Sequence, residues 1–160
     1  MSHAPGGERQ RYPGHLLTRI EPGREPRHGM APPDCPFCHL SRHSIRLETD
    51  SALAFLDAFP ITEGHTLVVP KRHVSSLFDL SEEEQTAIWR TVAQVRDALA
   101  SEFRPDGFNI GLNDGATAGQ TVMHAHVHVI PRRRGDVVDP RGGVRWVVPD
   151  KAAYWDGSQR

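Results

Sequence analysis

His124-Ala125-His126-Val127-His128-Val129-Ile130 is the stretch from which we predict the fold, because imidazole and aliphatic side chains alternate strictly along it. Successive side chains of an extended strand point to opposite faces, so the three histidines would share one face, roughly 6.5–7 Å apart. Threonine, lysine or glutamate would serve a solvated face better. A row of histidines therefore favours a chemical role over a half-buried strand whose polar face happens to be histidine.

Three short apolar runs upstream of this stretch predict further strands. They span residues 44–48, 52–57 and 66–69, and Pro70 ends the last of them. Turn residues separate the first two runs, and proline and glycine punctuate the loop before the third. Parallel strands would need crossover connections of about a dozen residues or more, so these short links favour antiparallel pairing.

One long helix is predicted to begin after Ser81. The serine hydroxyl can cap the first turn while Glu84 reaches back to form a capping box. Residues 104–107 stop the helix, residues 108–112 form a strand, and Pro131 ends the histidine strand. Residues 144–148 are either a further strand or an extended tail. The apolar stripe that turns the helix toward a core consists of Ile88, Val92, Val95, Leu99 and Phe103.

Length, composition and charge limit the kind of protein. At 160 residues and 38% hydrophobic content, the chain suits one domain over residues 34–150. A Pro/Gly/Arg-rich arm over residues 1–33 is expected to be disordered, and residues 151–160 form a tail. The formal net charge of -1 predicts no stable nucleic-acid partner and no membrane partner. Without an apolar run of roughly 18 residues or a signal-type segment, we predict a cytoplasmic protein.

A glycine-rich loop, residues 113–121, leads into the histidine stretch and predicts contact with phosphate. Its backbone N–H groups have little steric cover, and Gln120 and Thr121 add amide and hydroxyl donors. A nucleophilic histidine beside such donors indicates phosphoryl or nucleotidyl transfer through a phosphoramidate-type intermediate. The chain contains neither a Walker loop nor a Rossmann glycine fingerprint, which disfavours kinase and dehydrogenase functions.

One signature covers residues 111–132, which read G-x-N-D-G-x-x-A-G-Q-T-V-x-H-x-H-x-H-V-I-P-R. It resembles that of the histidine-triad (HIT) superfamily of nucleotide hydrolases and transferases. Residues 55–73 are similar to that family's nucleotide-binding half, and residues 139–145 resemble its bacterial diadenosine-polyphosphate-hydrolase-like members. The resemblance covers residues 35–149 and implies an α+β, HIT-like fold. Such a fold has a mostly antiparallel sheet of about five strands with one long helix packed on it, in agreement with the elements predicted above.

The resemblance also implies roles for individual residues. His126 would be the nucleophile that takes the α-phosphate, and His128 would orient phosphate or handle protons beside it. Asp57 would accept hydrogen bonds from the ribose hydroxyls. The residues that would hold phosphate or leaving-group oxygens are Gln120, Thr121, Asn113 and Gly119. The apolar slot for a purine would be formed by Phe55 and Ala58, with Phe37 or Leu40.

Cys35 and Cys38 form a C-x2-C pair, which provides half of a tetrahedral zinc site. Some family members carry a structural zinc, and the resemblance implies that His73 and His124 complete the ligand set. His39 and His43 are possible substitutes in this set. A redox dithiol is the rival interpretation, but the strand-then-helix context of thioredoxin-like motifs is absent around Cys35.

Several of these residues have a simpler structural interpretation. Phe55 fits a hydrophobic core as well as a base contact, and Asp57 and Asn113 both favour turns. His65 is expected to satisfy a backbone group rather than to act in catalysis. Arg132 to Arg134 are interpreted as a solvated basic turn.

The leading functional hypothesis is a zinc-containing nucleotide hydrolase that acts on a small purine nucleotide. Its candidate substrates are diadenosine polyphosphates and nucleoside phosphoramidates, cut at the α-phosphate through a nucleotidyl-histidine. A nucleotidyltransferase or phosphorylase with the same nucleophile and a non-catalytic adenylate-binding module remain the alternatives. The resemblance further implies a homodimer. Trp89 lies off the apolar stripe of the predicted helix and would either contribute to the dimer interface or cap the core.

Overall fold

The computed structural model describes residues 32–155 and contains one five-stranded antiparallel sheet in the order β1-β2-β3-β5-β4, with one long helix. The predicted α+β fold is thereby confirmed. The elements are β1 (Ile45–Glu48), β2 (Ala52–Leu56), β3 (Thr66–Pro70), α1 (Glu82–Phe103), β4 (Gly107–Gly111) and β5 (Val127–Arg132). Short 3-10 helices are η1 (Arg42–Ser44), η2 (Leu77–Asp79), η3 (Ala116–Ala118), η4 (Gly143–Val147) and η5 (Pro149–Lys151).

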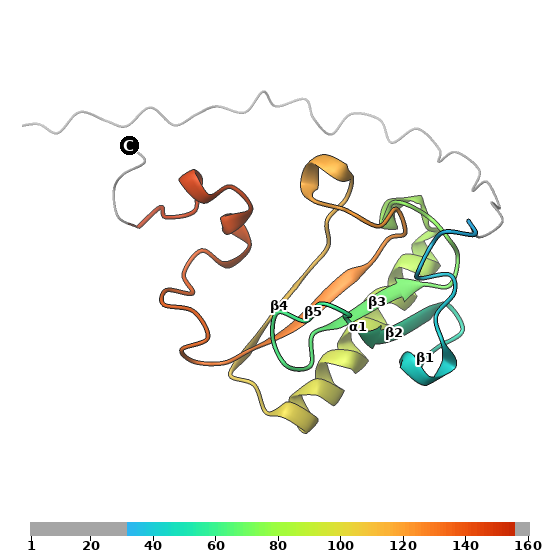
Figure 1. Ribbon diagram of the computed structural model, residues 1–160, viewed down its shortest axis with the longest axis horizontal. Coiled ribbons are helices and arrows are strands. Elements are labelled where there is room, and N and C mark those ends of the chain that lie inside the picture. Colours follow the sequence, from blue (N-terminus) through green and yellow to red (C-terminus); the bar gives the residue numbers. More distant parts are fainter. Residues whose placement is uncertain (1–31, 156–160) are drawn as a thin grey trace, which may run out of the picture.

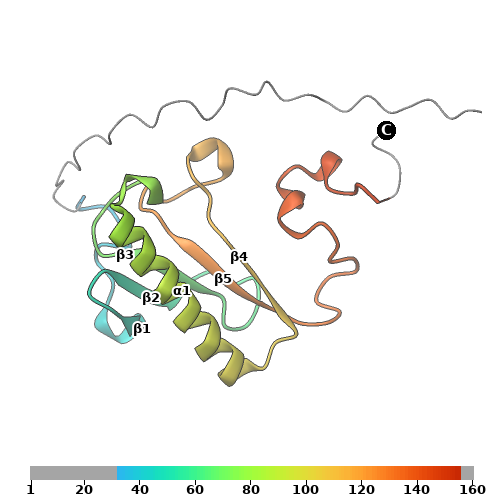
Figure 2. The same ribbon diagram turned by 180° about the vertical axis from the view of Figure 1, so that it is seen from behind.

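The helix α1 covers one face of the sheet, so the molecule has two layers (Figures 1 and 2). Its buried residues pack with alternate residues of β2, β3 and β5 in one hydrophobic core. The other face of the sheet, away from α1, is left for a second group of side chains. The main core contains Ala52, Ala54, Val68, Ile88, Val92, Val95, Leu99, Val127 and Val129.

Both ends of α1 follow from the sequence. The Ser81 hydroxyl accepts from the backbone N–H of Glu84, and the Glu84 carboxylate accepts from the backbone N–H of Ser81, so the predicted capping box is present. Arg104 ends the helix in the left-handed conformation, with φ of 47°. The apolar stripe of α1 faces the sheet as predicted.

The histidine strand begins later and ends later than the sequence predicts. β5 starts at Val127, because β3 pairs with it only from Thr66–Val129 to Val68–Val127. His124 to His126 leave the sheet, and Ala125 donates its N–H to the carbonyl of Val74 at 2.7 Å instead. Pro131 does not end the strand, because the β3 pairing stops before it and only β4 lies beside it.

The C-terminal residues differ from both predicted alternatives. The interpretation of residues 144–148 as a strand or extended tail is wrong, since Gly143–Val147 form η4. Gly142, with φ of 87°, and Gly143 supply the backbone conformations that begin this turn. Figures 1 and 2 show the segment standing beyond the β4 side of the sheet. Its Trp146 indole donates to the carbonyl of Arg141, and the Arg141 guanidinium lies over the ring of Trp155.

The predicted disordered arm, residues 1–33, falls on residues that are outside the described range except for its last two. The division into domain and C-terminal tail stays a prediction, as does the cytoplasmic location. Among the helices of residues 32–155, none combines the length and the hydropathy needed to cross a bilayer.

Candidate active site and metal centre

The sheet face away from α1 carries a small apolar cluster next to the histidines. Phe55, Leu67 and Val69 are its buried members, and Phe37, Leu40 and Leu53 pack against them. Phe55 is only 5% exposed and lies against Phe37, with ring centroids 5.3 Å apart. Phe55 is therefore a core residue, and Phe37 and Leu40 are the partly buried members that cover the cluster.

His126 has one ring nitrogen held by the backbone. Its Nδ1 donates to the carbonyl of His124 at 2.8 Å, which fixes the proton on Nδ1 and leaves a lone pair on Nε2. The ring is buried, and it meets the edge of Phe37 at 5.3 Å and the ring of His128 at 5.1 Å between centroids. A neutral imidazole oriented in this way is equipped to attack an electrophile through Nε2.

His128 receives its orientation from a histidine that is 63 residues away in the sequence. The backbone N–H of Ile61 donates to Nδ1 of His65 at 3.4 Å, so His65 carries its proton on Nε2. This Nε2 donates to Nδ1 of His128 at 3.0 Å, and a carboxylate oxygen of Asp57 lies 3.5 Å from it. The relay leaves the proton of His128 on Nε2, where it can act as a hydrogen-bond donor.

Burial keeps both histidines of this relay neutral. It lowers the pKa of His65, although the nearby Asp57 carboxylate opposes the change. Burial, followed by the charges of His126 and His65, lowers the pKa of His128 to about 4. At neutral pH, His128 therefore donates one hydrogen bond as an uncharged imidazole rather than as a cation.

The predicted phosphate loop is held together mainly by Gln120. The buried Gln120 amide donates to the carbonyls of Ser75 and Val122 at 2.8 and 3.1 Å, and its oxygen accepts from the N–H of Gly115 at 2.8 Å. The carbonyl of Gly119 accepts from the side-chain amide of Asn113 at 3.5 Å. Gly115 and Gly119 have φ of 90° and 96°, which lets the loop turn tightly. Gln120 thus shapes the loop with every polar atom of its side chain.

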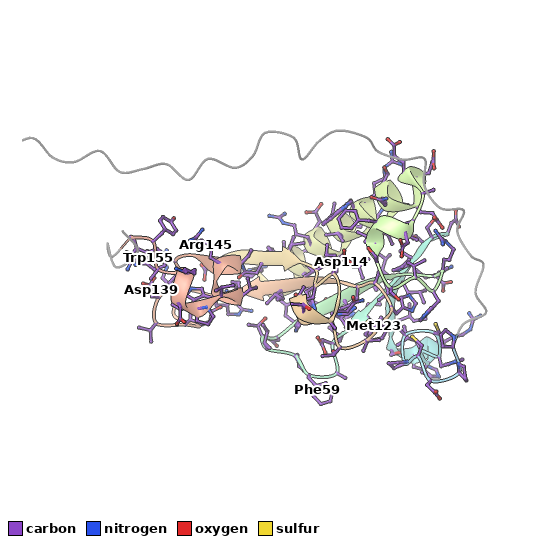
Figure 3. All side chains as sticks on the ribbon, turned by 90° about the horizontal axis from the view of Figure 1, so that it is seen from above. Phe59, Asp114, Met123, Asp139, Arg145 and Trp155 are labelled. Atoms are coloured by element: carbon purple, nitrogen blue, oxygen red, sulfur yellow. The ribbon has the colours of Figure 1, made fainter. Side chains whose placement is uncertain are left out.

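Three further residues of the sequence prediction lie at the surface or beside a cavity. Ala58 and Thr121 are exposed, and Asn113 lines the cavity described below. Asp57 accepts from the backbone N–H of Phe59 at 2.9 Å, which closes a turn, so its predicted turn role is present. Phe59 itself is 87% exposed and points away from the ribbon in Figure 3.

The four predicted metal ligands come together in space. Nδ1 of His124 lies 3.5 Å from both Cys35 Sγ and Cys38 Sγ. Nδ1 of His73 lies 3.3 Å from Cys38 Sγ and 3.3 Å from Nδ1 of His124. All four ligand atoms are within 4.8 Å of one another. His39, which contacts the carbonyl of Pro32, is exposed and outside this cluster, as is the exposed His43.

The chemistry of this cluster fits a zinc ion. Nε2 of His124 donates to the carbonyl of Pro70 at 2.8 Å, so its Nδ1 presents a lone pair to the two sulfurs. Burial and then the neighbouring Cys35 raise the pKa of Cys38 to about 11, so the protein groups alone do not favour a thiolate. A divalent cation would offset that cost, and two sulfurs with two imidazole nitrogens form a zinc ligand set of the tetrahedral kind.

A cavity of about 840 Å³ begins at the relay and runs toward the C-terminal segment. Its lining includes Asp57, His65 and His128 of the relay and Trp146 of the C-terminal segment. At its wall Arg132 donates to Asp136 at 2.6 and 2.8 Å and to the side chain of Asn109. Figure 3 shows the segment that carries Asp139, Arg145 and Trp155 at the far end of the molecule. The cavity therefore reaches His128, beside His126.

Sequence reasoning missed two parts of this site. The backbone bond predicted for His65 is present, but its contact with His128 was not foreseen, and only its place in the upstream similarity hinted at a role. Nor did the sequence indicate that Asn109, Arg132 and Trp146 would line one cavity, since no periodicity links them.

Comparison with known proteins gives a match to one family model. The model describes the HIT domain and matches residues 41–135. This range contains both the relay and the loop, together with His73 and His124. The two cysteines lie just before it.

Three related proteins illustrate what is known of similar chains. An uncharacterized HIT-like protein of Mycoplasma genitalium is 39% identical over 102 residues, 61% of this chain and 72% of that protein. An asymmetrical bis(5'-nucleosyl)-tetraphosphatase of Schizosaccharomyces pombe is 43% identical over 88 residues, 55% of this chain and 48% of the other. A bis(5'-adenosyl)-triphosphatase of Dictyostelium discoideum is 36% identical over 97 residues, 61% of this chain and 65% of the relative.

One solved structure bears on the metal cluster. A zinc-bound histidine-triad family protein of Mycobacterium smegmatis is 36% identical to this chain, with a TM-score of 0.60. The similarity covers 66% of this chain and 80% of that protein. The likeness extends to the fold as well as to the sequence.

Proposed function

The chain belongs to the HIT family, and on this premise we propose that it is a nucleotide hydrolase that cleaves at the α-phosphate of adenosine nucleotide derivatives. The observation that carries the proposal is the bond from Nδ1 of His126 to the carbonyl of His124, which leaves Nε2 free to attack. Relatives that act on nucleotide polyphosphates support the hydrolase class.

The reaction proceeds in two displacements at phosphorus. In the first, Nε2 of His126 forms a P–N bond as the bond to the leaving group breaks, and the leaving group takes that electron pair. In the second, water attacks the nucleotidyl-histidine and the P–N pair returns to Nε2, releasing the nucleoside monophosphate. His128 donates through Nε2 to phosphate or leaving-group oxygen, because the relay from His65 fixes its tautomer.

Substrate recognition uses the groups around the apolar cluster. Asp57 accepts from the ribose hydroxyls, which requires its carboxylate to exchange the backbone bond from Phe59 or to share it. Phe37, Leu40 and Ala58 contact the purine, while the cluster of the buried Phe55 packs against Phe37 and Leu40. Phosphate oxygens are held by backbone N–H groups near Gly119, with Asn113 and Thr121, and Gln120 keeps the loop in shape.

The size of the cavity favours a large leaving group. With about 840 Å³ between Asp57 and Trp146, it has room for a second nucleoside. Dinucleoside polyphosphates are therefore the preferred substrates, ahead of nucleoside phosphoramidates. A transferase or phosphorylase would use the same nucleophile, and turnover that requires added phosphate would identify it.

The same proposal includes one zinc ion held by Cys35, Cys38, His73 and His124. The family relationship to a zinc-bound protein and the convergence of four ligand atoms support it. Bound there, zinc would tie the residues around the C-x2-C pair to the loop that carries the first histidine. It would stabilise the fold and take no part in bond making, because the chemical steps belong to His126 and His128.

We also propose that the protein is a homodimer formed along β4. This strand lies at the edge of the sheet, and its Ile110 is 42% exposed. Trp89 on the outer side of α1 is 45% exposed and would extend the interface. Sedimentation equilibrium should give a dimer, and Ile110→Asp should shift it toward the monomer while the exposed control Phe78→Asp does not. A wild-type monomer at micromolar concentration would contradict this part of the proposal.

A substrate panel tests the function directly. The wild-type chain is mixed with diadenosine tri- and tetraphosphate and with adenosine phosphoramidate, and products are separated by chromatography. We expect a nucleoside monophosphate from each and faster turnover of the dinucleotides. His126→Ala should abolish turnover, and the matched control His43→Ala, an exposed histidine outside both clusters, should not. Nucleotide binding without turnover in the wild type would favour a non-catalytic adenylate-binding module instead.

A further inference from the structure

The proposed nucleophile lies outside the sheet. Pairing between β3 and β5 begins only at Val68–Val127, and β4 pairs with β5 between Gly111–His128 and Gly107–Arg132. His126 is therefore one residue before the strand and makes no ladder bond that would fix it. Something other than the sheet must hold the ring of His126 in place.

The metal cluster supplies the groups that hold it. The ring of His124 belongs to the cluster, while the backbone carbonyl of the same residue accepts from Nδ1 of His126 at 2.8 Å. Between these two histidines, Ala125 donates its N–H to the carbonyl of Val74, the residue after the ligand His73. Two contacts therefore link His126 to the cluster. One is the bond to the backbone of the ligand His124, and the other is the bond from Ala125 to Val74, which follows the ligand His73.

A third contact comes from the turn that carries the sulfur ligands. Cys38 donates its N–H to the carbonyl of Cys35 at 3.1 Å, and Phe37 lies within this turn. The Phe37 ring meets His126 at 5.3 Å and His124 at 6.0 Å between centroids, both edge to face. Movement of the turn would therefore displace the aromatic ring against which the nucleophile packs.

We propose that the Cys35/Cys38/His73/His124 cluster is a positioning device for His126, so that metal occupancy determines how well the nucleophile is aimed. The inference rests on the proposed function. Four ligand atoms drawn to one ion fix the His124 carbonyl, the Val74 carbonyl and the Phe37 ring relative to one another. Without an ion, the ligand atoms have no common centre, and the segment before β5 can shift. A displacement of about 1 Å at a reacting group can lower a rate roughly 100-fold.

Substitutions at Cys38 separate positioning from simple support of the fold. Cys38→Ser should lose zinc and lower kcat by about 10- to 100-fold, with a much smaller change in KM. Cys38→His keeps four metal-binding side chains and should restore both zinc content and kcat. Leu99→Ala is the control, because it opens a cavity in the α1 core and removes none of the four ligands. It should lower the melting temperature but leave zinc content and kcat, measured well below that temperature, unchanged.

A spectroscopic measurement follows the nucleophile itself. Long-range 1H–15N NMR of the full-length protein reports which ring nitrogen of His126 carries the proton. The zinc-loaded chain should show a single Nδ1–H tautomer, and the chain stripped by a chelator should show both tautomers. Added zinc should return the first spectrum. The same wild-type comparison serves if Cys38→Ser does not fold.

Two results would overturn the inference. One is a zinc-free chain whose His126 stays in the single Nδ1–H tautomer, and the other is a zinc-free chain with the kcat of the loaded protein. Failure of the proposed function looks different: the zinc-loaded wild type would then turn over none of the panel substrates. In that case the tautomer measurement still decides whether the cluster orients His126.

Discussion

Two groups of side chains of the kinds that bind metals each include one of the histidines that flank His126 in the sequence, His124 or His128. They differ in the hydrogen-bond partners of their histidine nitrogens. In the Cys35/Cys38/His73/His124 cluster, His124 donates outward to the carbonyl of Pro70, so its remaining lone pair faces two sulfurs and a second imidazole. In the Asp57/His65/His128 group, a chain of N–H donors starts at the backbone of Ile61 and gives a partner to both ring nitrogens of His65 and to Nδ1 of His128.

The two groups show that the hydrogen-bond partner of one ring nitrogen determines whether the other nitrogen of a histidine presents a lone pair or a proton. Both groups bring their ligand atoms within 4.8 Å of one another, so distance alone would assign a cation to each. In the first group the lone pair of His124 faces two sulfurs and a second imidazole, an arrangement that fits a cation. In the second group the ring nitrogens are joined by hydrogen bonds, and one donor remains at Nε2 of His128. The first group is suited to hold the backbone segment that carries His126, and the second to orient His128 beside it.

The largest expected difference is between substitution of a cluster histidine, His124, and substitution of the nucleophile, His126. His124→Ala should release zinc and lower the free energy of unfolding by more than about 4 kcal/mol, a size typical of losing a bound metal. His126→Ala should keep zinc and change that free energy far less, while kcat falls by about 10⁴-fold or more. Urea unfolding, elemental analysis and steady-state rates measure the three quantities. Similar changes in all three quantities for the two variants would mean that the roles of His124 and His126 are assigned wrongly.

A smaller effect is expected within the relay. His65→Ala removes the donor that fixes the tautomer of His128, so kcat should fall by about 100-fold with zinc content unchanged. Elemental analysis and rates on the same preparation check both parts. The exposed histidine variant His43→Ala should have neither effect. Loss of zinc from His65→Ala would show that the two groups are not independent.

The pH dependence of stability should also distinguish the groups. The pKa of His128 is about 4 in the folded protein and 6.5 in the ordinary reference state, so only the unfolded chain binds the proton between these values. Stability from this group is complete above pH 6.5 and is lost as the pH falls toward 4, by about 2 kcal/mol at most for a partly exposed ring. The free energy of unfolding is measured in urea at pH 7 and at pH 4.5 for the wild type and for His128→Asn. Subtracting the change in one protein from the change in the other cancels the contribution of the metal ligands, which both proteins share. Equal pH dependence in both proteins would contradict the assignment.

The smallest effect sets a baseline outside both groups. Ser81→Ala removes the cap of α1 and should lower the free energy of unfolding by about 1 kcal/mol. Zinc content and kcat should stay at the wild-type values. A change in either would mean that any loss of stability disturbs the site. The effects of the other substitutions could then not be assigned to the two groups.

The sequence predicted the elements whose signals are local. The capping box at Ser81 and the apolar stripe predicted the helix, and alternating or continuous apolar runs predicted the strands of the sheet. The four proposed zinc ligands could be chosen because the resemblance paired the two cysteines with His73 and His124, and the structure brings these four side chains together.

Other features depend on contacts that no local pattern encodes. Alternation continues through His124 and His126, yet the chain leaves the sheet there because the His124 ring turns into the cluster and bonds to Pro70. The pairing of His65 with His128 joins residues 63 positions apart. Residues 144–148 are rich in valine and suggest a strand, but the two glycines before them, Gly142 and Gly143, start a 3-10 turn.

Trapping of the covalent intermediate tests the central claim most directly. Wild-type protein is mixed with a dinucleoside polyphosphate, quenched in base, where a phosphoramidate survives, and digested for mass spectrometry. The account predicts a nucleotidyl group on His126 and none in the His126→Ala variant. A nucleotidyl group on His124 or His128, or full turnover by His126→Ala, would contradict it.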